Sequence, residues 1–294
     1  MRYGSGVALV VLAGLLWSVI SLAIRHIEAG TWAVLFWRSA GMVPVLLAYF
    51  AWTSGGRVVS LVQRMGWVGA VGGFGLVFAF AGGIYAIQAT TVANAAFLFA
   101  ASPFMTAVLG WLVLRERVRR ATWAAIALAG VGMVIMLREG LAAGAMAGNV
   151  AALLSALGFS AFTVTLRRGK LEDMMPAVVL GGVFSMLVAG AVLMAQGGAV
   201  WVSGRDIVIA MAMGAGLLGL GLALYTLGSK VVPAAEMSLL SMVEVMFAPV
   251  WVFLVLGETA SPATFAGGAV VMAAIAVNAL SGMRRPAVTS TFGP

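Results

Sequence analysis

Ten apolar runs, separated by short polar segments, occupy most of this chain. A helix that crosses the hydrocarbon core of a bilayer needs about 20 consecutive apolar residues, and each run is close to that length. The runs cover residues 5–24, 31–52, 66–87, 91–114, 121–137, 147–166, 174–195, 207–228, 233–256 and 263–282. The sequence therefore predicts an all-α integral membrane protein with ten transmembrane helices.

The shortage of charge supports the same prediction. Hydrophobic residues make up 63% of the chain and charged residues 9%, whereas charged residues are about 25% of an ordinary soluble domain. The surplus apolar surface must therefore face lipid. We interpret residues 5–24 as the first span rather than a signal peptide, because similar runs follow and no hydrophilic mature domain does.

The distribution of basic residues predicts the orientation. With a cytoplasmic N-terminus, three basic residues (Arg25, Arg138 and Arg205) fall in outside loops, and thirteen fall in inside segments. Inside loops of membrane proteins carry the excess of Lys and Arg, so we expect both termini in the cytoplasm. The inside residues are Arg2, Arg57, Arg64, Arg115, Arg117, Arg119, Arg120, Arg167, Arg168, Lys170, Lys230, Arg284 and Arg285.

The chain also repeats itself. A shift of 142 residues aligns residues 1–142 with residues 143–283, and residues 284–294 remain as a short polar tail that we expect to be disordered. Each half holds five spans, an odd number, so the second half must enter the membrane in the opposite sense. Such a 5+5 inverted repeat is the architecture that lets a carrier expose one central site to either side in turn.

Two stretches at this offset carry a family resemblance. Residues 93–116 contain a Ser-Pro pair and end in Trp-Leu-Val-Leu-Arg-Glu, and residues 235–258 contain Glu244 and end in Leu-Val-Leu-Gly-Glu. Together with Trp17 and Arg38, this pattern resembles the twin repeats of the EamA family in the drug/metabolite transporter superfamily. The aromatic amino-acid exporters are the members that the sequence resembles most.

The resemblance implies a ten-helix basket with a central cavity that exports amino acids or related metabolites without hydrolysing nucleotide, in a bacterial inner membrane. Two positions depart from the family pattern. Arg115 stands where the first repeat usually has Gly, and Val245 stands where the second usually has Pro after Glu244. Because Pro249 lies four residues after Val245, we expect any kink of the ninth span to sit one turn further along.

Charged residues within the spans are the first site candidates, because a charge near the bilayer centre costs at least ~2.5 kcal/mol on insertion scales. Glu244 lies near the middle of the ninth span, where it could hold a proton or meet a cationic group; the alternative is a bond to a neighbouring helix. Arg38 could act as a gate or a carboxylate clamp, or could serve structure alone. Glu116, at a span end, is expected to be a solvated cap or a local salt bridge.

Aromatic and polar residues complete the predicted site. Trp17, Phe159, Tyr85 and Tyr225 lie deep in their spans and could line a cavity for an aromatic or hydrophobic solute. The hydroxyl and amide groups could bind a zwitterion or could simply join helices. The two prolines can free backbone carbonyls within a span. The predicted substrate-binding residues are Trp17, Ser18, Tyr85, Asn94, Ser102, Phe159, Tyr225 and Glu244, and the predicted gating or coupling residues are Arg38, Glu244, Pro103 and Pro249.

These features favour a secondary transporter for a small metabolite, with amino acids first and cationic drugs as the alternative. A non-transporting receptor or scaffold would not need the repeat. An enzyme is disfavoured because the chain has no Cys, one His, and no Asp in any span. We expect no cofactor and no bound metal. We also expect no nucleic-acid partner, because the basic residues are scattered rather than clustered in one stripe. One chain holds both halves, so a monomer can suffice.

Overall fold

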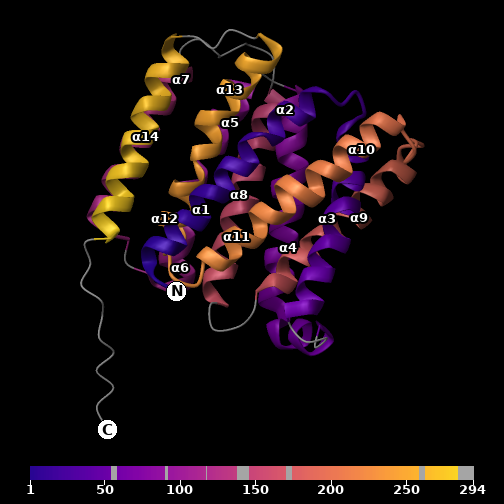
Figure 1. Cartoon of the computed structure of the whole chain (residues 1–294), viewed down its shortest axis with the longest axis horizontal. Coiled ribbons are helices and arrows are strands. Elements are labelled where there is room, and N and C mark those ends of the chain that lie inside the picture. The colour runs from indigo at the N-terminus through magenta and orange to yellow at the C-terminus, as the bar shows by residue number, and fades with distance from the viewer. Residues whose placement is uncertain are drawn as a thin grey trace.

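The computed structural model describes residues 1–53, 58–89, 92–116, 118–137, 146–169, 174–257 and 262–283 (Figure 1). Every regular element within these ranges is a helix. Their bounds are α1 Tyr3–Ser18, α2 Ile20–Arg25, α3 Thr31–Thr53, α4 Val58–Ala89, α5 Val92–Phe99, α6 Ser102–Leu114, α7 Arg120–Leu137, α8 Met146–Arg168, α9 Met175–Ala195, α10 Gly204–Ala212, η1 Met213–Gly219, α11 Leu220–Gly228, α12 Ala234–Ser241, α13 Val243–Leu256 and α14 Pro262–Met283.

Several of these helices continue one another, so the described elements form ten helical passes, which we number in chain order. The first pass is α1–α2, the fourth α5–α6, the eighth α10–η1–α11 and the ninth α12–α13. Each of the others is a single element, although α4 is kinked at Gly66, whose backbone is not helical. Seven passes are long and apolar enough to cross a membrane by length and composition. The fourth, fifth and tenth fall short of that standard within the described residues, where Ser102–Leu114 and Ala269–Asn278 are shorter apolar helices.

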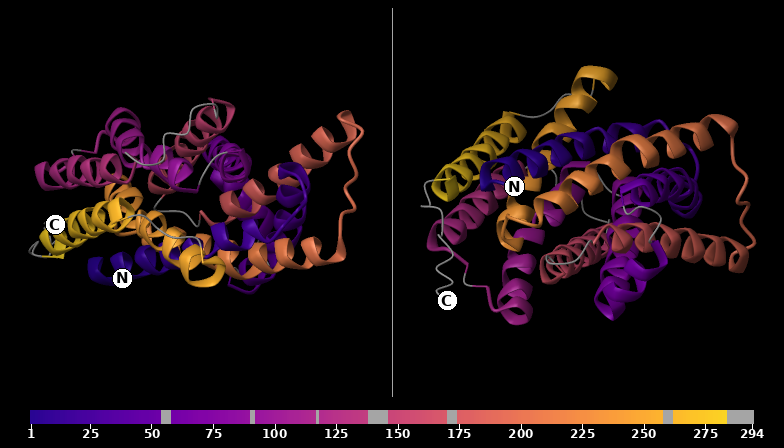
Figure 2. Two further views of the ribbon diagram at one scale, coloured as in Figure 1. Left: turned by 90° about the horizontal axis from the view of Figure 1, so that it is seen from above. Right: turned by 60° about the horizontal axis from the view of Figure 1, so that its bottom comes forward.

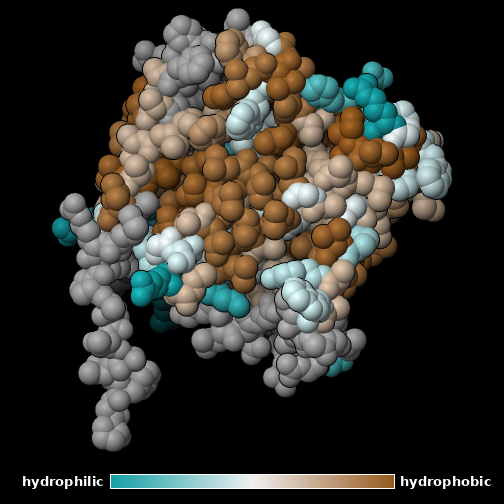
Figure 3. Space-filling view, in the orientation of Figure 1, coloured by the Kyte–Doolittle hydropathy of each residue, from teal (hydrophilic) through white to brown (hydrophobic). Residues whose placement is uncertain are grey.

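The face of the bundle seen in Figure 3 is apolar at its centre. Figure 3 shows hydrophobic side chains across the centre of one face and hydrophilic ones toward its ends. Leu112, Leu187 and Val208 are 60%, 61% and 67% exposed. Side chains of this kind on a soluble protein would form an exposed apolar patch, whereas here they suit contact with lipid.

Small residues let the passes approach closely, and the third and eighth passes are rich in glycine. The third pass packs on the sixth and seventh, the second on the seventh and eighth, and the first on the eighth and ninth. The fifth and tenth passes lie side by side at one edge (Figure 2). Where α4 crosses α8, a Cβ added to Gly75 would lie 2.7 Å from the Gly158 carbonyl oxygen, so the two backbones are in direct contact.

Several passes are interrupted along their length. The first breaks at Val19, the fourth at Ala100 and Ala101, and the ninth at Met242. The eighth widens into the π-helix η1, a form that is rare and often occurs at functional sites. Pro103 lies in the first turn of α6, just after the break, where a missing backbone N–H costs little.

The break in the ninth pass corrects the expected kink beyond Val245. The Met242 N–H bonds to the Leu239 carbonyl at 3.1 Å, a three-residue step that ends α12. The helix α13 then continues without interruption past Pro249, whose side chain lies outside the described residues. The interruption of the ninth pass therefore coincides with the change from four-residue to three-residue hydrogen bonds before Glu244.

Hydrogen bonds define the two ends of the bundle. At the end that holds both Tyr3 and Ser281, here called the termini end, the Tyr3 hydroxyl donates to Glu236 at 2.5 Å, and Arg119 donates to Ser281 at 3.1 Å. At the other end, here called the loop end, the Gln88 side chain donates to the Ala29 carbonyl at 3.0 Å. The first pass therefore begins, and the tenth ends, on the same side of the bundle (Figure 1).

Candidate functional site

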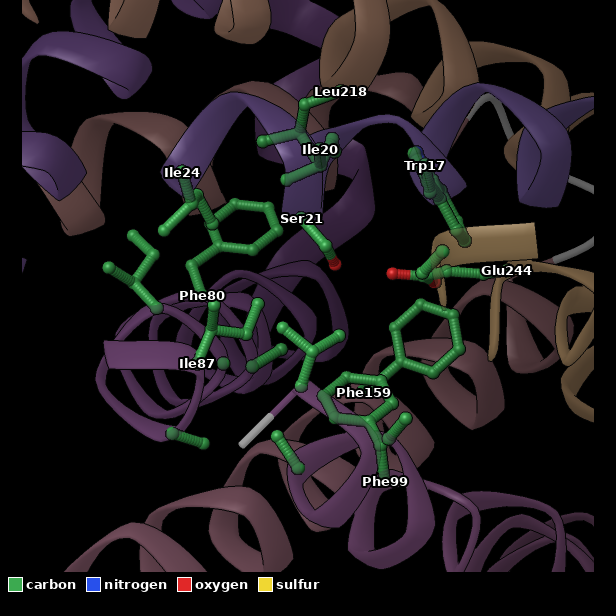
Figure 4. Close-up of a pocket in the computed structure, with 18 of the residues that line it drawn as sticks. Trp17, Ile20, Ser21, Ile24, Phe80, Ile87, Phe99, Phe159, Leu218 and Glu244 are labelled. Carbon is green, nitrogen blue, oxygen red and sulfur yellow. The ribbon is translucent and has the colours of Figure 1, made fainter. Parts of the chain in front are cut away.

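A cavity of about 110 Å³ lies within the bundle. Helices α1 to α5, α8, α11 and α13, together with η1, contribute its walls, which are mainly aliphatic and aromatic (Figure 4). A single water needs roughly 10–15 Å³ of such volume, so the cavity has room for a small organic group. Its lining includes two side chains that carry formal charge, Arg38 and Glu244.

Arg38 is nearly buried, at 4% exposure, and its guanidinium carbon lies 4.5 Å from the centre of the Phe80 ring. This position over the ring face is a cation–π contact. Its Nε and Nη2 atoms have no hydrogen-bond partner. Among the described residues, no carboxylate forms an ion pair with Arg38, and Glu244 on the same cavity does not do so either.

Close backbone packing holds Arg38 in place. A Cβ added to Gly214 in η1 would meet the Arg38 carbonyl oxygen, and one added to Gly41 would lie 2.6 Å from the Met211 Cα. Only glycine at these positions lets α3 and the eighth pass come this close. The second pass is thereby fixed with the Arg38 side chain directed at the cavity.

Glu244 occupies the first turn of α13, directly after the Met242 break. Figure 4 shows its carboxyl group pointing into the cavity toward the Ser21 hydroxyl. Ser21 is 6% exposed and belongs to the cavity wall, although it is not in the predicted set of substrate-binding residues. Its position four residues after Trp17, on the same helical face, is the signal that could have found it.

An aromatic cluster forms one wall. The Trp17 ring packs edge-on against Phe159, with centroids 5.7 Å apart, and lies 5.3 Å from the Tyr225 ring. Trp17 and Phe159 line the cavity, whereas Tyr225 lies behind them and its hydroxyl is 2.9 Å from Thr163 Oγ1. The Trp17 indole Nε1 has no hydrogen-bond partner and lies against Gly221, where an added Cβ would clash with it.

Other predicted site residues lie away from the cavity. Tyr85 is 41% exposed and points outward. Its neighbour Ile84 faces the cavity, and successive residues of a helix point in directions about 100° apart. Ser18 donates to the Leu15 carbonyl at 2.6 Å and accepts from the Trp251 indole at 2.8 Å. It therefore joins two helices. The side chain of Asn94 lies outside the described residues.

Ser102 also joins helices. Its hydroxyl is 2.9 Å from Ser238 Oγ and 3.3 Å from Ser160 Oγ, and all three side chains are fully buried. Ser238 lies between Glu236 and Glu244 along the ninth pass, so this serine cluster separates the cavity from the termini end. Pro103, next to Ser102, is buried but does not line the cavity.

Two ion pairs lie at the termini end, and their four residues line a hollow that shares no residue with the main cavity. Arg119 Nε lies 2.7 Å from Glu236, and Arg167 Nε lies 2.7 Å from Glu116. Each pair joins the first half of the sequence to the second. The pairing of Glu116 corrects the expected solvated cap or local bridge, because its partner is 51 residues away.

The loop end is arranged differently. A hollow at this end, lined by residues of the 24–30 segment together with Ile87 and Gln88, shares Ile24 and Ile87 with the main cavity. The cavity therefore adjoins the surface at this end. Among the described residues, no group of three or more His, Asp or Glu side chains could hold a metal ion.

Comparisons with known proteins agree with this architecture. A solved crystal structure superposes with a TM-score of 0.78 at 20% identity, covering 97% of this chain and 100% of the other, and is one of 28 solved chains that match. At this identity the likeness shows the fold alone. A comparison with curated proteins found no match. Residues 4–138 match the model of the EamA-like transporter family, which confirms the predicted resemblance for the first half of the chain.

Proposed function

We propose that this protein is a secondary transporter that carries a small organic metabolite across a membrane by alternating access. The observation that carries the proposal is the cavity with Arg38 and Glu244 in its wall, inside a lipid-facing bundle, adjoining the loop end and shut off from the termini end. Charged groups within a membrane bundle mark solute or ion pathways by default. The family match of residues 4–138 is to transporters, which are not enzymes.

The 5+5 inverted repeat of residues 1–142 and 143–283 is part of this proposal. The fourth and ninth passes are interrupted at Ala100 and Met242, 142 residues apart, which is the offset found in the sequence. The packing is also reciprocal: the first pass packs on the eighth and ninth as the sixth packs on the third and fourth. A pseudo-twofold axis in the membrane plane would produce this pattern.

The two ion pairs of the termini end are the proposed cytoplasmic gate. With both termini in the cytoplasm, as the basic residues predict, the structure has its cavity nearer the outside. Opening inward requires the Arg119–Glu236 and Arg167–Glu116 pairs to separate, because each joins one half to the other. Solute binding and gate opening would then alternate between the two sides of the membrane.

Amino acids with aromatic or hydrophobic side chains are the proposed solutes, and export from the cytoplasm across a bacterial inner membrane is the proposed direction. The rings of Trp17 and Phe159 offer an apolar surface for such a side chain. Cationic compounds are the second candidate, favoured by the carboxyl group of Glu244 in the same wall.

Counterflow tests the proposal. Proteoliposomes preloaded with unlabelled L-phenylalanine should take up labelled L-phenylalanine faster than protein-free liposomes. Trp17→Ala should lose this uptake, while Trp111→Ala, which changes a side chain that is 61% exposed on the outer surface, should retain it. Exchange of a labelled cationic compound instead would favour the second candidate. Binding without exchange of any of these solutes would indicate a receptor and refute transport.

A further inference from the structure

We propose that Arg38 and Glu244 form a two-ended charge site that selects zwitterionic solutes, with the solute carboxylate at Arg38 and its ammonium group at Glu244. The inference rests on the transport function proposed above and assigns the residues that recognise its solute. Both side chains line one cavity, and neither has an ion-pair partner among the described residues.

The free edge of Arg38 defines the anionic end. A guanidinium stays protonated in proteins, so its charge persists in this buried position. Nε and Nη2 are the two nitrogens without a partner, and their N–H groups point along one edge of the guanidinium plane. That edge matches the two oxygens of a carboxylate in a bidentate pair. The Phe80 ring covers a face of the guanidinium and leaves its edges for hydrogen bonding.

The same two nitrogens are covered by neighbouring atoms in this state. A solute reaches them only when the surrounding wall relaxes, so binding is coupled to a local rearrangement around α3. Buried donors without partners destabilise the empty protein, and a carboxylate that satisfies them should therefore stabilise the occupied one.

Glu244 defines the cationic end. Its carboxyl group points into the cavity beside the Ser21 hydroxyl (Figure 4), and among the described residues no Lys, Arg or His pairs with it. An ammonium group placed there can donate to the carboxylate and to the hydroxyl oxygen together. Because Arg38 repels any lone cation in the same cavity, a solute with an ammonium group and no carboxylate should bind poorly.

The cavity limits what connects the two charges. Its volume of about 110 Å³ is of the same order as the ~150 Å³ of an engineered apolar cavity that holds benzene. That size suits one ring or one branched aliphatic group, so the charged backbone of the solute takes the space that opens when the wall around α3 relaxes. Trp17 and Phe159 would contact that apolar part.

Binding to the purified full-length protein in detergent, measured by calorimetry, tests the assignment separately from transport. Three probes share a phenyl ring: L-phenylalanine carries both charges, phenethylamine lacks the carboxylate, and 3-phenylpropionate lacks the ammonium group. The wild type should bind phenylalanine at least about tenfold more tightly than either analogue, because an unmatched buried polar group penalises the wrong ligand.

The variants should remove one preference each. Arg38→Met should bind phenethylamine at least as well as phenylalanine, and Glu244→Gln should bind 3-phenylpropionate at least as well as phenylalanine. Arg168→Met is the charge-matched control, because the Arg168 guanidinium stacks on Trp67 outside the cavity. This variant should keep the wild-type order of affinities for the three probes. If Arg38→Met does not fold, Arg38→Lys keeps the charge, loses the bidentate edge and should weaken phenylalanine binding about tenfold.

The outcomes separate the two proposals. Equal wild-type affinities for phenylalanine and phenethylamine overturn the charge assignment, as does an unchanged order of preference in folded Arg38→Met. If the protein performs counterflow of another solute but does not bind phenylalanine, the charge assignment is also overturned and the transport proposal stands. The expected preferences without counterflow support the charge site and refute the transporter.

Discussion

The contact between Gly214 and the backbone of Arg38 offers a direct test of how the site is positioned. A Cβ at residue 214 would lie 2.8 Å from the Arg38 carbonyl carbon, whereas carbon atoms pack best at about 3.5–4.0 Å. In Gly214→Ala, α3 and η1 must therefore separate by roughly 1 Å. Overpacking of this kind typically costs about 1–3 kcal/mol. Because Arg38 moves with α3, phenylalanine affinity should also fall about tenfold, which corresponds to about 1.4 kcal/mol.

Gly216 provides the control within the same π-helix. A Cβ added there has no atom within 4 Å, and alanine favours helix over glycine by about 0.5–1 kcal/mol. Thermal unfolding in detergent should therefore show a lower Tm for Gly214→Ala and an unchanged or higher Tm for Gly216→Ala. Calorimetry with phenylalanine should show weaker binding only in the first. Equal Tm values and equal affinities for the two variants would refute the argument that close packing positions Arg38.

Two further predictions concern the aromatic wall and the gate. In Gly221→Ala, the new methyl group should displace the Trp17 indole and weaken phenylalanine binding more than leucine binding, as competition assays can show; an equal loss for both would contradict the role of the ring. Disrupting the pair in Arg119→Ala should favour opening at the termini end. Because the chain has no cysteine, a single Ser238→Cys can report this through faster maleimide labelling from that side. The swap of Arg119→Glu with Glu236→Arg should restore slow labelling, and unchanged labelling in Arg119→Ala would argue against a gate.

The sequence identifies as site candidates those residues whose charge is unfavourable inside a membrane. Arg38 and Glu244 are costly inside a bilayer, so each required a reason, and the structure brings both to one cavity. Trp17 and Phe159 stand 142 residues apart, the offset of the proposed repeat, and their rings are in contact. The apolar runs likewise predicted the ten passes, because hydrophobic length is a local property.

Rotation about each helix axis was beyond the sequence. A pass that is apolar all round carries no amphipathic signal, so nothing in the third span indicated that Tyr85 faces outward while its neighbour Ile84 faces the cavity. The partner of Glu116 was equally hidden, because an ion pair with Arg167 depends on where two distant helix ends meet. Ser18 joins two helices because it accepts a hydrogen bond from Trp251, a partner that the sequence did not indicate.

The wide turn of residues 213–219 sets the phase of the eighth pass. An α-helix advances about 100° per residue, so loss of a single residue from this turn would swing every later side chain of α11 by about a quarter of a revolution. Gly221 would leave the Trp17 indole, and Leu222 would leave the cavity wall. One extra residue in a single helical turn thus decides which surface of this pass the solute meets.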